Sequence, residues 1–174
     1  MGVRSRNETS SEVVAASLFV PVPPRELYEV VLDVRNFPSW APGVRRVEVL
    51  KGPVGPGMIS EWEIYVLGLR RKVSSVLVHA EDPKFLCWTY EGPVSGYGEC
   101  AIQDLGHGSL AEFKTEMHPA EPALQGLART LPARNAARIH LKRCLARLGQ
   151  LVADNSSRTT ATRSGSDHQN RLSE

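Results

Sequence analysis

The sequence predicts an α+β fold in which a curved antiparallel sheet of about seven strands wraps a long C-terminal helix, with two short helices between the first and second strands. Three observations support this prediction. A helical segment and an aromatic, proline-rich segment separate the first two strand patterns. Later segments alternate apolar and polar residues with a period of two, which is typical of antiparallel strands with one covered face. The last apolar segment has the spacing of an amphipathic helix.

The stretch from Pro21 to Leu50 contains the two short helices. A strand over residues 12–20 precedes it, and the first helix begins at Pro24, where a missing N–H costs no hydrogen bond. The apolar face of this helix is formed by Leu27, Val30, Val31 and Val34. An aromatic pair, Phe37 and Trp40, follows between the helix-breaking residues Asn36, Pro38 and Pro42, and we expect it to pack the rim of any cavity rather than contact a ligand.

The middle of the chain is predicted to form antiparallel strands. They cover residues 58–67, 71–79, 85–91, 98–105 and 111–118. The last strand shows the clearest alternation, because Ala111, Phe113, Thr115 and Met117 are separated by charged residues and a histidine. The glycine-rich segment Gly92–Gly98 is either a mobile flap bearing Tyr97 or a wide hairpin turn, and its Gly-Pro composition favours the turn.

The long helix is predicted to start at Pro132 and to end near Val152. Its apolar residues fall in one arc: Ala133, Ala137, Leu141, Cys144, Leu145, Leu148, Leu151 and Val152. The residues that follow are polar and cannot bury enough apolar surface to order themselves. We therefore expect a disordered N-terminus over residues 1–11, one ligand-binding domain over residues 12–153 and a disordered polar tail over residues 154–174.

This combination resembles the START-like, or SRPBCC, helix-grip superfamily, and within it the polyketide cyclase/dehydrase and coenzyme-Q-binding branch. The resemblance covers Glu12 to about Val152. It rests on the prolines before the first helix, Asp33-Val34 at the helix end, the run Phe37-Pro38-Ser39-Trp40, and Val44 followed by alternating Val47 and Val49. The resemblance implies a cavity between the sheet and the terminal helix. It does not name a ligand, because the superfamily contains both enzymes and lipid carriers.

Composition narrows the function classes. The 174 residues suffice for one domain with a full core. No apolar run approaches the roughly 20 residues of a transmembrane helix, and the N-terminus lacks the apolar region of a secretion signal, so we expect a cytoplasmic protein. The chain contains no nucleotide-binding or hydrolase motif, and its histidines and cysteines lack metal-ligand spacing. We expect neither a metal nor a cofactor.

Five residues with predicted side chains on the covered face are the candidate ligand-binding residues of the sheet: Trp62, Trp88, Tyr90, Phe113 and Met117. Aromatic rings and a thioether give a large, adaptable apolar surface. The alternative is that they only pack the core. With the cavity that the resemblance implies, the leading function is binding of a hydrophobic or aromatic small molecule, such as a lipid, a quinone or a polyketide-like compound.

Arg134 is the candidate polar anchor, because it projects near the middle of the apolar arc of the long helix. Its guanidinium would suit a carboxylate, phenolate or phosphate of a ligand, and the alternative is that it reaches into water. The resemblance also implies a second function, a polyketide cyclase/aromatase-type enzyme that catalyses aldol cyclisation and dehydration. Such chemistry needs a proton donor or acceptor, for which Tyr90 is the weak candidate; other catalytic residues are unknown.

A basic row on the long helix supports a third function. It consists of Arg138, Lys142, Arg143 and Arg147. This row is either a solvated face or a surface that docks an acidic partner such as an acyl carrier protein. Nucleic acid is not an expected partner, because the aromatic residues lie on covered faces away from the basic row.

Overall fold

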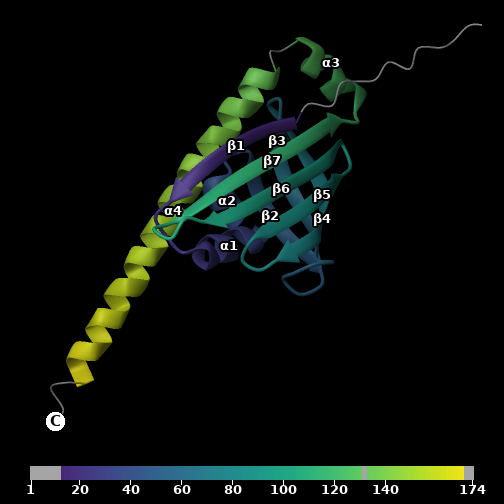
Figure 1. The fold of residues 1–174 in the computed structure, drawn as a ribbon. Coiled ribbons are helices and arrows are strands. Elements are labelled where there is room, and N and C mark those ends of the chain that lie inside the picture. Colours follow the sequence, from purple (N-terminus) through teal and green to yellow (C-terminus); the bar gives the residue numbers. More distant parts are fainter. Residues whose placement is uncertain (1–12, 131–132, 171–174) are drawn as a thin grey trace, which may run out of the picture.

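A computed structural model describes the backbone of residues 13–130 and 133–170 and the side chains of residues 13–126 and 136–158 (Figure 1). Seven strands form one antiparallel sheet in the order β1-β7-β6-β5-β4-β3-β2. The strands are β1 (Val13–Val20), β2 (Val44–Lys51), β3 (Ile59–Val66), β4 (Leu69–Glu81), β5 (Phe85–Glu91), β6 (Val94–Asp104) and β7 (Ser109–Pro119). The predicted number and antiparallel pairing of the strands are confirmed.

The first two strands are consecutive in the chain and yet form the two opposite edges of the sheet. The connection between them contains α1 (Pro24–Leu32), the 3-10 turn η1 (Val34–Asn36) and α2 (Phe37–Trp40), as the sequence predicts. Asp33 ends α1, and its side chain accepts a hydrogen bond from the Arg35 backbone N–H at 3.1 Å. The short helices therefore cross from one edge of the curved sheet to the other.

Two helices follow the sheet, α3 (Pro122–Thr130) and α4 (Ala133–Asn170). The long helix α4 runs beside β1 and packs against α1 and α2, and its C-terminal part extends beyond the sheet (Figure 1). The buried residues of α4 are Cys144, Leu145, Leu148 and Val152. This part of the predicted arc is confirmed, whereas Ala137 is exposed and the side chain of Ala133 lies outside the described residues. The α+β helix-grip prediction is correct.

The end of α4 differs from the prediction. The sequence predicts an end near Val152 and a disordered tail from residue 154, but the helix continues to Asn170. A helix pairs its backbone N–H and C=O groups within its own segment, so polar residues can continue it without an apolar face to bury. The N-terminal residues 1–11, predicted to be disordered, lie outside the described part of the chain, as do residues 171–174. The proposed domain limits stay a prediction.

The connection between β5 and β6 also differs. The turn is confined to Gly92-Pro93, and residues 94–98 belong to β6, where all of them pair with β7 and residues 96–98 pair with β5 as well. The predicted flap or wide turn over Gly92–Gly98 is therefore wrong. A side chain at Gly96 would collide with the backbone carbonyl of Glu116, so glycine at this position permits strand pairing. Among the described helices, none combines the length and apolar character needed to cross a bilayer.

Candidate functional site

A cavity of about 180 Å³ lies between the inner face of the sheet and α4. All five candidate residues of the strands line it: Trp62, Trp88, Tyr90, Phe113 and Met117. The period-two alternation puts them there, because Trp62, Ile64 and the other inner residues of β3 to β7 share one face of the sheet. Met117 is 45% exposed although it lines the cavity, so it lies on an open side.

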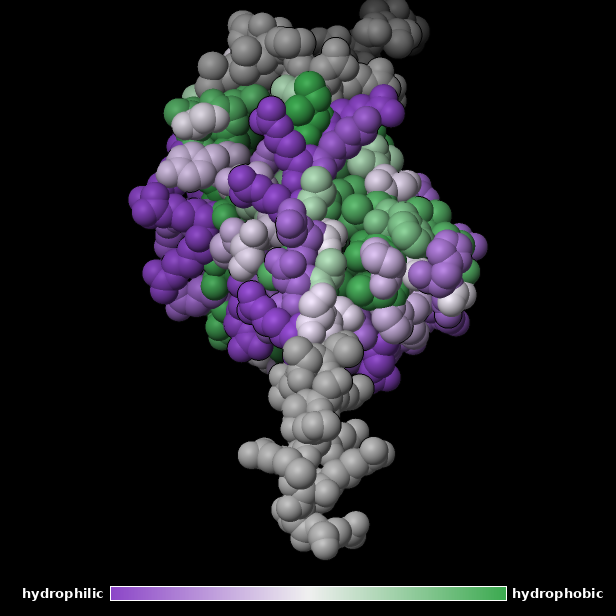
Figure 2. All heavy atoms as spheres, turned by 90° about the vertical axis from the view of Figure 1, so that its left-hand side faces the viewer, coloured by the Kyte–Doolittle hydropathy of each residue, from purple (hydrophilic) through white to green (hydrophobic). Residues whose placement is uncertain are grey.

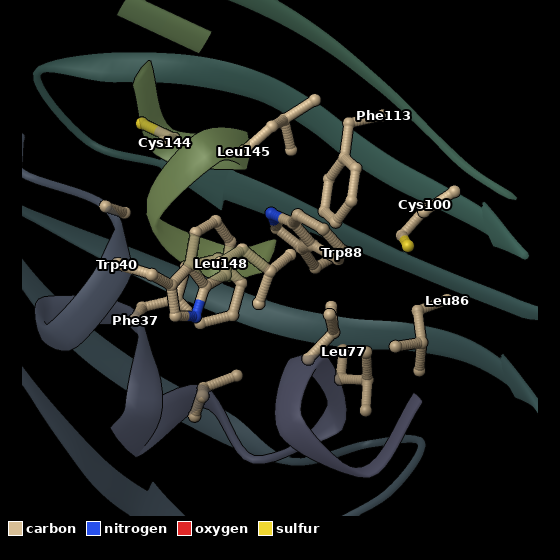
Figure 3. Close-up of a cluster of buried hydrophobic side chains, with 14 of the residues drawn as sticks. Phe37, Trp40, Leu77, Leu86, Trp88, Cys100, Phe113, Cys144, Leu145 and Leu148 are labelled. Atoms are coloured by element: carbon tan, nitrogen blue, oxygen red, sulfur yellow. The ribbon is translucent and has the colours of Figure 1, made fainter. Parts of the chain in front are cut away.

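Aromatic rings form a continuous wall around this space. Phe37 is at its centre, with ring centroids 4.3 Å from Trp40, 4.6 Å from Trp62 and 5.7 Å from Trp88. Figure 3 shows Phe37, Trp40, Trp88 and Phe113 beside the residues of α4. The contacts of Phe37 with Trp62 and Trp88 are edge-to-face, the geometry that aromatic pairs prefer. Such interlocked rings give a firm apolar surface.

The aromatic pair of α2 has a larger part in the cavity than the sequence predicts. Phe37 and Trp40 are buried and line the cavity itself, together with Leu141 and Cys144 of α4. Sequence reasoning placed the pair at the rim because its distance from the sheet depends on how α2 docks. The signal for a role in the cavity was the presence of two aromatic residues among the helix-breaking residues Asn36, Pro38 and Pro42.

A chain of hydrogen bonds crosses one side of the cavity. The indole N–H of Trp88 donates to the hydroxyl of Tyr90, and the hydroxyl of Thr115 donates to the backbone carbonyl of Tyr97 at 3.2 Å. An indole N–H can only donate, so the Tyr90 hydroxyl is the acceptor of the Trp88 bond. A polar interaction with Thr115 also acts on Tyr90 and lowers its pKa. The Tyr90 hydroxyl is therefore held in place within the wall.

The electrostatic setting of Tyr90 keeps the proton on its phenol. Burial raises the pKa of this phenol well above its usual value, and the hydrogen bonds with Trp88 and Thr115 offset only part of that rise. Tyr90 is therefore protonated at neutral pH. Its role as the weak catalytic candidate stays a prediction.

Two further indoles flank the cavity in different ways. The Trp62 N–H donates to the Ser60 hydroxyl at 2.7 Å, and both groups are buried. The Trp40 N–H is buried and has no hydrogen-bond partner in the described part of the protein. The apolar wall thus contains one unpaired donor, which at a buried position costs about 1–3 kcal/mol.

The α4 side of the cavity contains a histidine that sequence reasoning left without a role. His140 lines the cavity one helical turn before Cys144, and its Nε2 lies 3.5 Å from the Cys144 Sγ. Partial burial, together with the charge of Arg143, lowers the pKa of His140. Burial raises the pKa of Cys144 to about 11, so this residue is a thiol at neutral pH. The spacing of four residues between His140 and Cys144, which puts both on one face of a helix, was the available signal in the sequence.

The predicted anchor Arg134 stays a prediction, because its side chain lies outside the described residues. Among the side chains that the structure does describe, no group of three or more His, Cys, Asp or Glu residues is placed to hold a metal ion. The cavity in the described structure is therefore lined mainly by aromatic and aliphatic groups, and its polar lining residues are Tyr90, Lys114, Thr115, His140 and Cys144.

Solved structures with this architecture are similar over most of their length. A protein from Thermus thermophilus, TTHA0849, has a TM-score of 0.71 and 20% identity, over 83% of this chain and 99% of that one. A START superfamily protein from Mycobacterium smegmatis has a TM-score of 0.62 and 15% identity, over 80% and 98% of the two chains. The Zhui aromatase/cyclase from Streptomyces sp. R1128 has a TM-score of 0.62 and 17% identity, over 82% and 94%. At these identities the likeness shows a shared fold.

The sequence family agrees with the fold. No curated protein sequence matches this chain. Residues 11–153 match the family described as polyketide cyclase / dehydrase and lipid transport, which covers most of the chain. The chain therefore belongs to the polyketide cyclase/dehydrase and lipid transport family, in the START-like superfamily that its sequence resembles.

Proposed function

We propose that this protein binds a hydrophobic or aromatic small molecule in the cavity between the sheet and α4. The observation that carries the proposal is the convergence of aromatic side chains from α2, β3, β5 and β7 on one space. Burying an apolar ligand there gains about 25 cal/mol for each Å² removed from water. The indole of Trp62 and the phenol of Tyr90 are already hydrogen-bonded, so an apolar ligand leaves them satisfied.

The volume of the cavity limits the part of the ligand that it encloses. An apolar protein cavity of about 150 Å³ holds one benzene molecule, and pockets for drug-sized ligands have about 300–1,000 Å³. A cavity of about 180 Å³ therefore takes one ring or a short alkyl segment. A quinone head, the terminal ring of a polyketide-like compound or the end of a lipid chain fits this limit. The remainder of a larger ligand would extend outside this enclosed space.

The second candidate is a cyclase/aromatase-type enzyme that catalyses aldol cyclisation and dehydration. The family description and the fold shared with an aromatase/cyclase support it. This chemistry needs a side chain that gives or takes a proton within hydrogen-bond reach of the substrate. Tyr90 lies at the cavity, but its hydroxyl already accepts a hydrogen bond from Trp88 and burial raises its pKa well above neutral. We therefore favour binding over catalysis.

The third candidate is docking of an acidic protein such as an acyl carrier protein. It is supported by the basic row on α4, whose four side chains are all exposed. Figure 2 faces this helix and shows hydrophilic residues along it. Charge complementarity would speed such docking more than it would strengthen it. The cavity observations do not depend on this role.

The binding proposal is tested with N-phenyl-1-naphthylamine, a neutral aromatic probe whose fluorescence rises in apolar surroundings. We expect saturable binding with one site per chain. Ala137 lines the cavity on an exposed part of α4, so Ala137→Trp should fill the opening and weaken binding about tenfold, the equivalent of 1.4 kcal/mol. The matched control is Ala136→Trp, an exposed neighbour outside the cavity lining, which should bind as the wild type does.

Mass spectrometry of an organic extract from the purified protein provides an independent test. A co-purifying apolar compound in the wild type, reduced in Ala137→Trp and retained in Ala136→Trp, would support the proposal. Absence of saturable probe binding together with an empty extract would refute it.

A further inference from the structure

A second hollow lies on the outside of the protein next to the cavity. It is an open groove of about 590 Å³ between α4 and the segment that leads into β2. The lining residues that matter here are Gly43, Tyr65, His140, Arg143 and Arg147. Three of them belong to one face of α4, where positions 140, 143 and 147 follow the spacing of successive helical turns.

The groove and the cavity share a boundary. His140 lines both spaces. The residues where β2 begins contribute to both as well: Ala41 and Val44 line the cavity, and Pro42 and Gly43 line the groove. The imidazole of His140 rests on Gly43, because a Cβ atom at Gly43 would lie 3.0 Å from its Nε2. The contact between His140 and Gly43 therefore stands between the apolar interior and the outer groove.

The groove has a positive charge that no acid in its lining balances. Arg143 and Arg147 are exposed and have no ion-pair partner among the described residues, and no acidic residue is part of the lining. Tyr65, on the opposite side, accepts a hydrogen bond from the guanidinium of Arg45 at 3.3 Å. The groove therefore presents two guanidinium groups, which suit the oxygens of a carboxylate, sulfonate or phosphate.

The carboxylate of Glu63, which pairs with the Arg45 that contacts Tyr65, is not available to cancel this charge. Glu63 forms an ion pair with Arg45 at 3.2 Å and a second one with Arg70, so two guanidinium groups already share its single charge. The hydrogen bond from Arg70 is the main reason that the pKa of Glu63 lies below its usual value. This carboxylate is therefore occupied by Arg45 and Arg70.

We propose that the ligand is amphipathic, with its apolar part in the aromatic cavity and an anionic group in the outer groove at Arg143 and Arg147. The proposal rests on the proposed binding function and adds the chemical class of the ligand. His140 lies where the ligand would pass from one space to the other. The anion is a carboxylate, sulfonate or phosphate attached to a ring or to a short apolar chain.

Two probes with the same ring system test this inference. N-phenyl-1-naphthylamine is neutral, and 8-anilino-1-naphthalenesulfonate has the same rings with one sulfonate. We expect the wild type to bind the sulfonate more tightly than the neutral probe. The double variant Arg143→Gln/Arg147→Gln should weaken sulfonate binding about tenfold, the order expected for one hydrogen bond to a charged group, and leave the neutral probe unaffected.

The control variant is Arg138→Gln/Lys142→Gln, which removes the same two positive charges from exposed positions of α4 outside the groove lining. It should bind both probes as the wild type does. Equal loss of sulfonate binding in both double variants would overturn the anion site while neutral-probe binding upheld the proposed function. Sulfonate binding that survives Ala137→Trp would separate the groove from the cavity and overturn the amphipathic ligand. Failure of the neutral probe to bind the wild type would overturn both proposals.

Discussion

The two faces of the sheet are formed by the same strands but differ in how far their side chains find partners within the protein. On β3, Trp62 faces the cavity, while its neighbours Glu61 and Glu63 face outward and are paired with Lys72, Arg45 and Arg70. These two carboxylates are therefore paired with basic side chains of the sheet itself. The inner face leaves a space of about 180 Å³ that its own side chains do not fill. A foreign molecule has apolar surface to gain inside and little to gain from the paired charges outside.

The groove beside α4 also differs from the outer face of the sheet, in whether its basic side chains have carboxylate partners. Five basic side chains of β2 to β4 have carboxylate partners: Arg45, Arg46, Arg70, Arg71 and Lys72. On α4, Arg143 and Arg147 have none among the described residues. Unpaired charge next to unfilled apolar space is the combination on which the amphipathic-ligand proposal depends.

The largest loss of stability is expected from substitution of Trp88 on the inner face, which is 6% exposed. Trp88→Ala removes a buried ring from the aromatic wall and should lower the free energy of unfolding by about 3–5 kcal/mol. Urea denaturation followed by circular dichroism measures this loss. Trp88→Phe keeps an aromatic ring and should cost less. A loss below about 1 kcal/mol in Trp88→Ala would mean that the wall is not a packed part of the core.

A smaller effect on the inner face is expected from Tyr90. Tyr90→Phe removes the hydroxyl that accepts from Trp88, leaving a buried indole N–H unpaired. The free energy of unfolding should fall by about 1–3 kcal/mol, again measured in urea. Binding of the neutral probe should be retained, because the ring remains in place. Unchanged stability would contradict the hydrogen-bond chain described above.

The outer face should respond least in stability. The ion pair between Glu61 and Lys72, at 2.6 Å, is partly exposed to solvent, so Glu61→Gln should cost at most about 1 kcal/mol. Added salt should reduce the difference from the wild type further. A cost as large as that of Trp88→Ala would remove the proposed distinction between a structural inner wall and a satisfied outer face.

His140, at the boundary between cavity and groove, should give the stability of the protein a weak pH dependence. Because the pKa of His140 is lowered in the folded protein, the unfolded chain binds its proton more readily. The stability associated with neutral His140 is present above its ordinary pKa near 6.5 and is lost as the pH falls through the lowered folded value. His140→Asn should flatten the pH dependence of the melting temperature in this range. An identical pH profile in the variant would contradict this position for His140.

The sequence predicts the inner face well because strand alternation alone decides it. Trp62, Trp88 and Phe113 were assigned to the covered side by counting in steps of two, and each lines the cavity. The antiparallel sheet and the amphipathic part of α4 follow from periodicities of the same kind. These features depend on local spacing, which is fully present in one sequence.

Features that depend on a neighbouring element were missed. The sequence predicts an interruption at Gly96 and the start of a strand at Gly98, but both residues lie inside β6 opposite a partner that needs the space. A side chain at Gly98 would enter the indole ring of Trp88 on β5. The roles of Phe37 and His140 depend on how α2 and α4 dock on the sheet. No local pattern in a single sequence contains that distance information.

The central claim is that a ligand occupies the inner face of the sheet. The protein has three tryptophans, and all of them, Trp40, Trp62 and Trp88, line the cavity, which makes their indole N–H signals in ¹H–¹⁵N NMR direct reporters. Titration with N-phenyl-1-naphthylamine should shift all three signals to saturation and leave the backbone amides of Glu48 and Glu61 on the outer face unchanged. Unmoved indole signals, or shifts confined to the outer face, would contradict the claim.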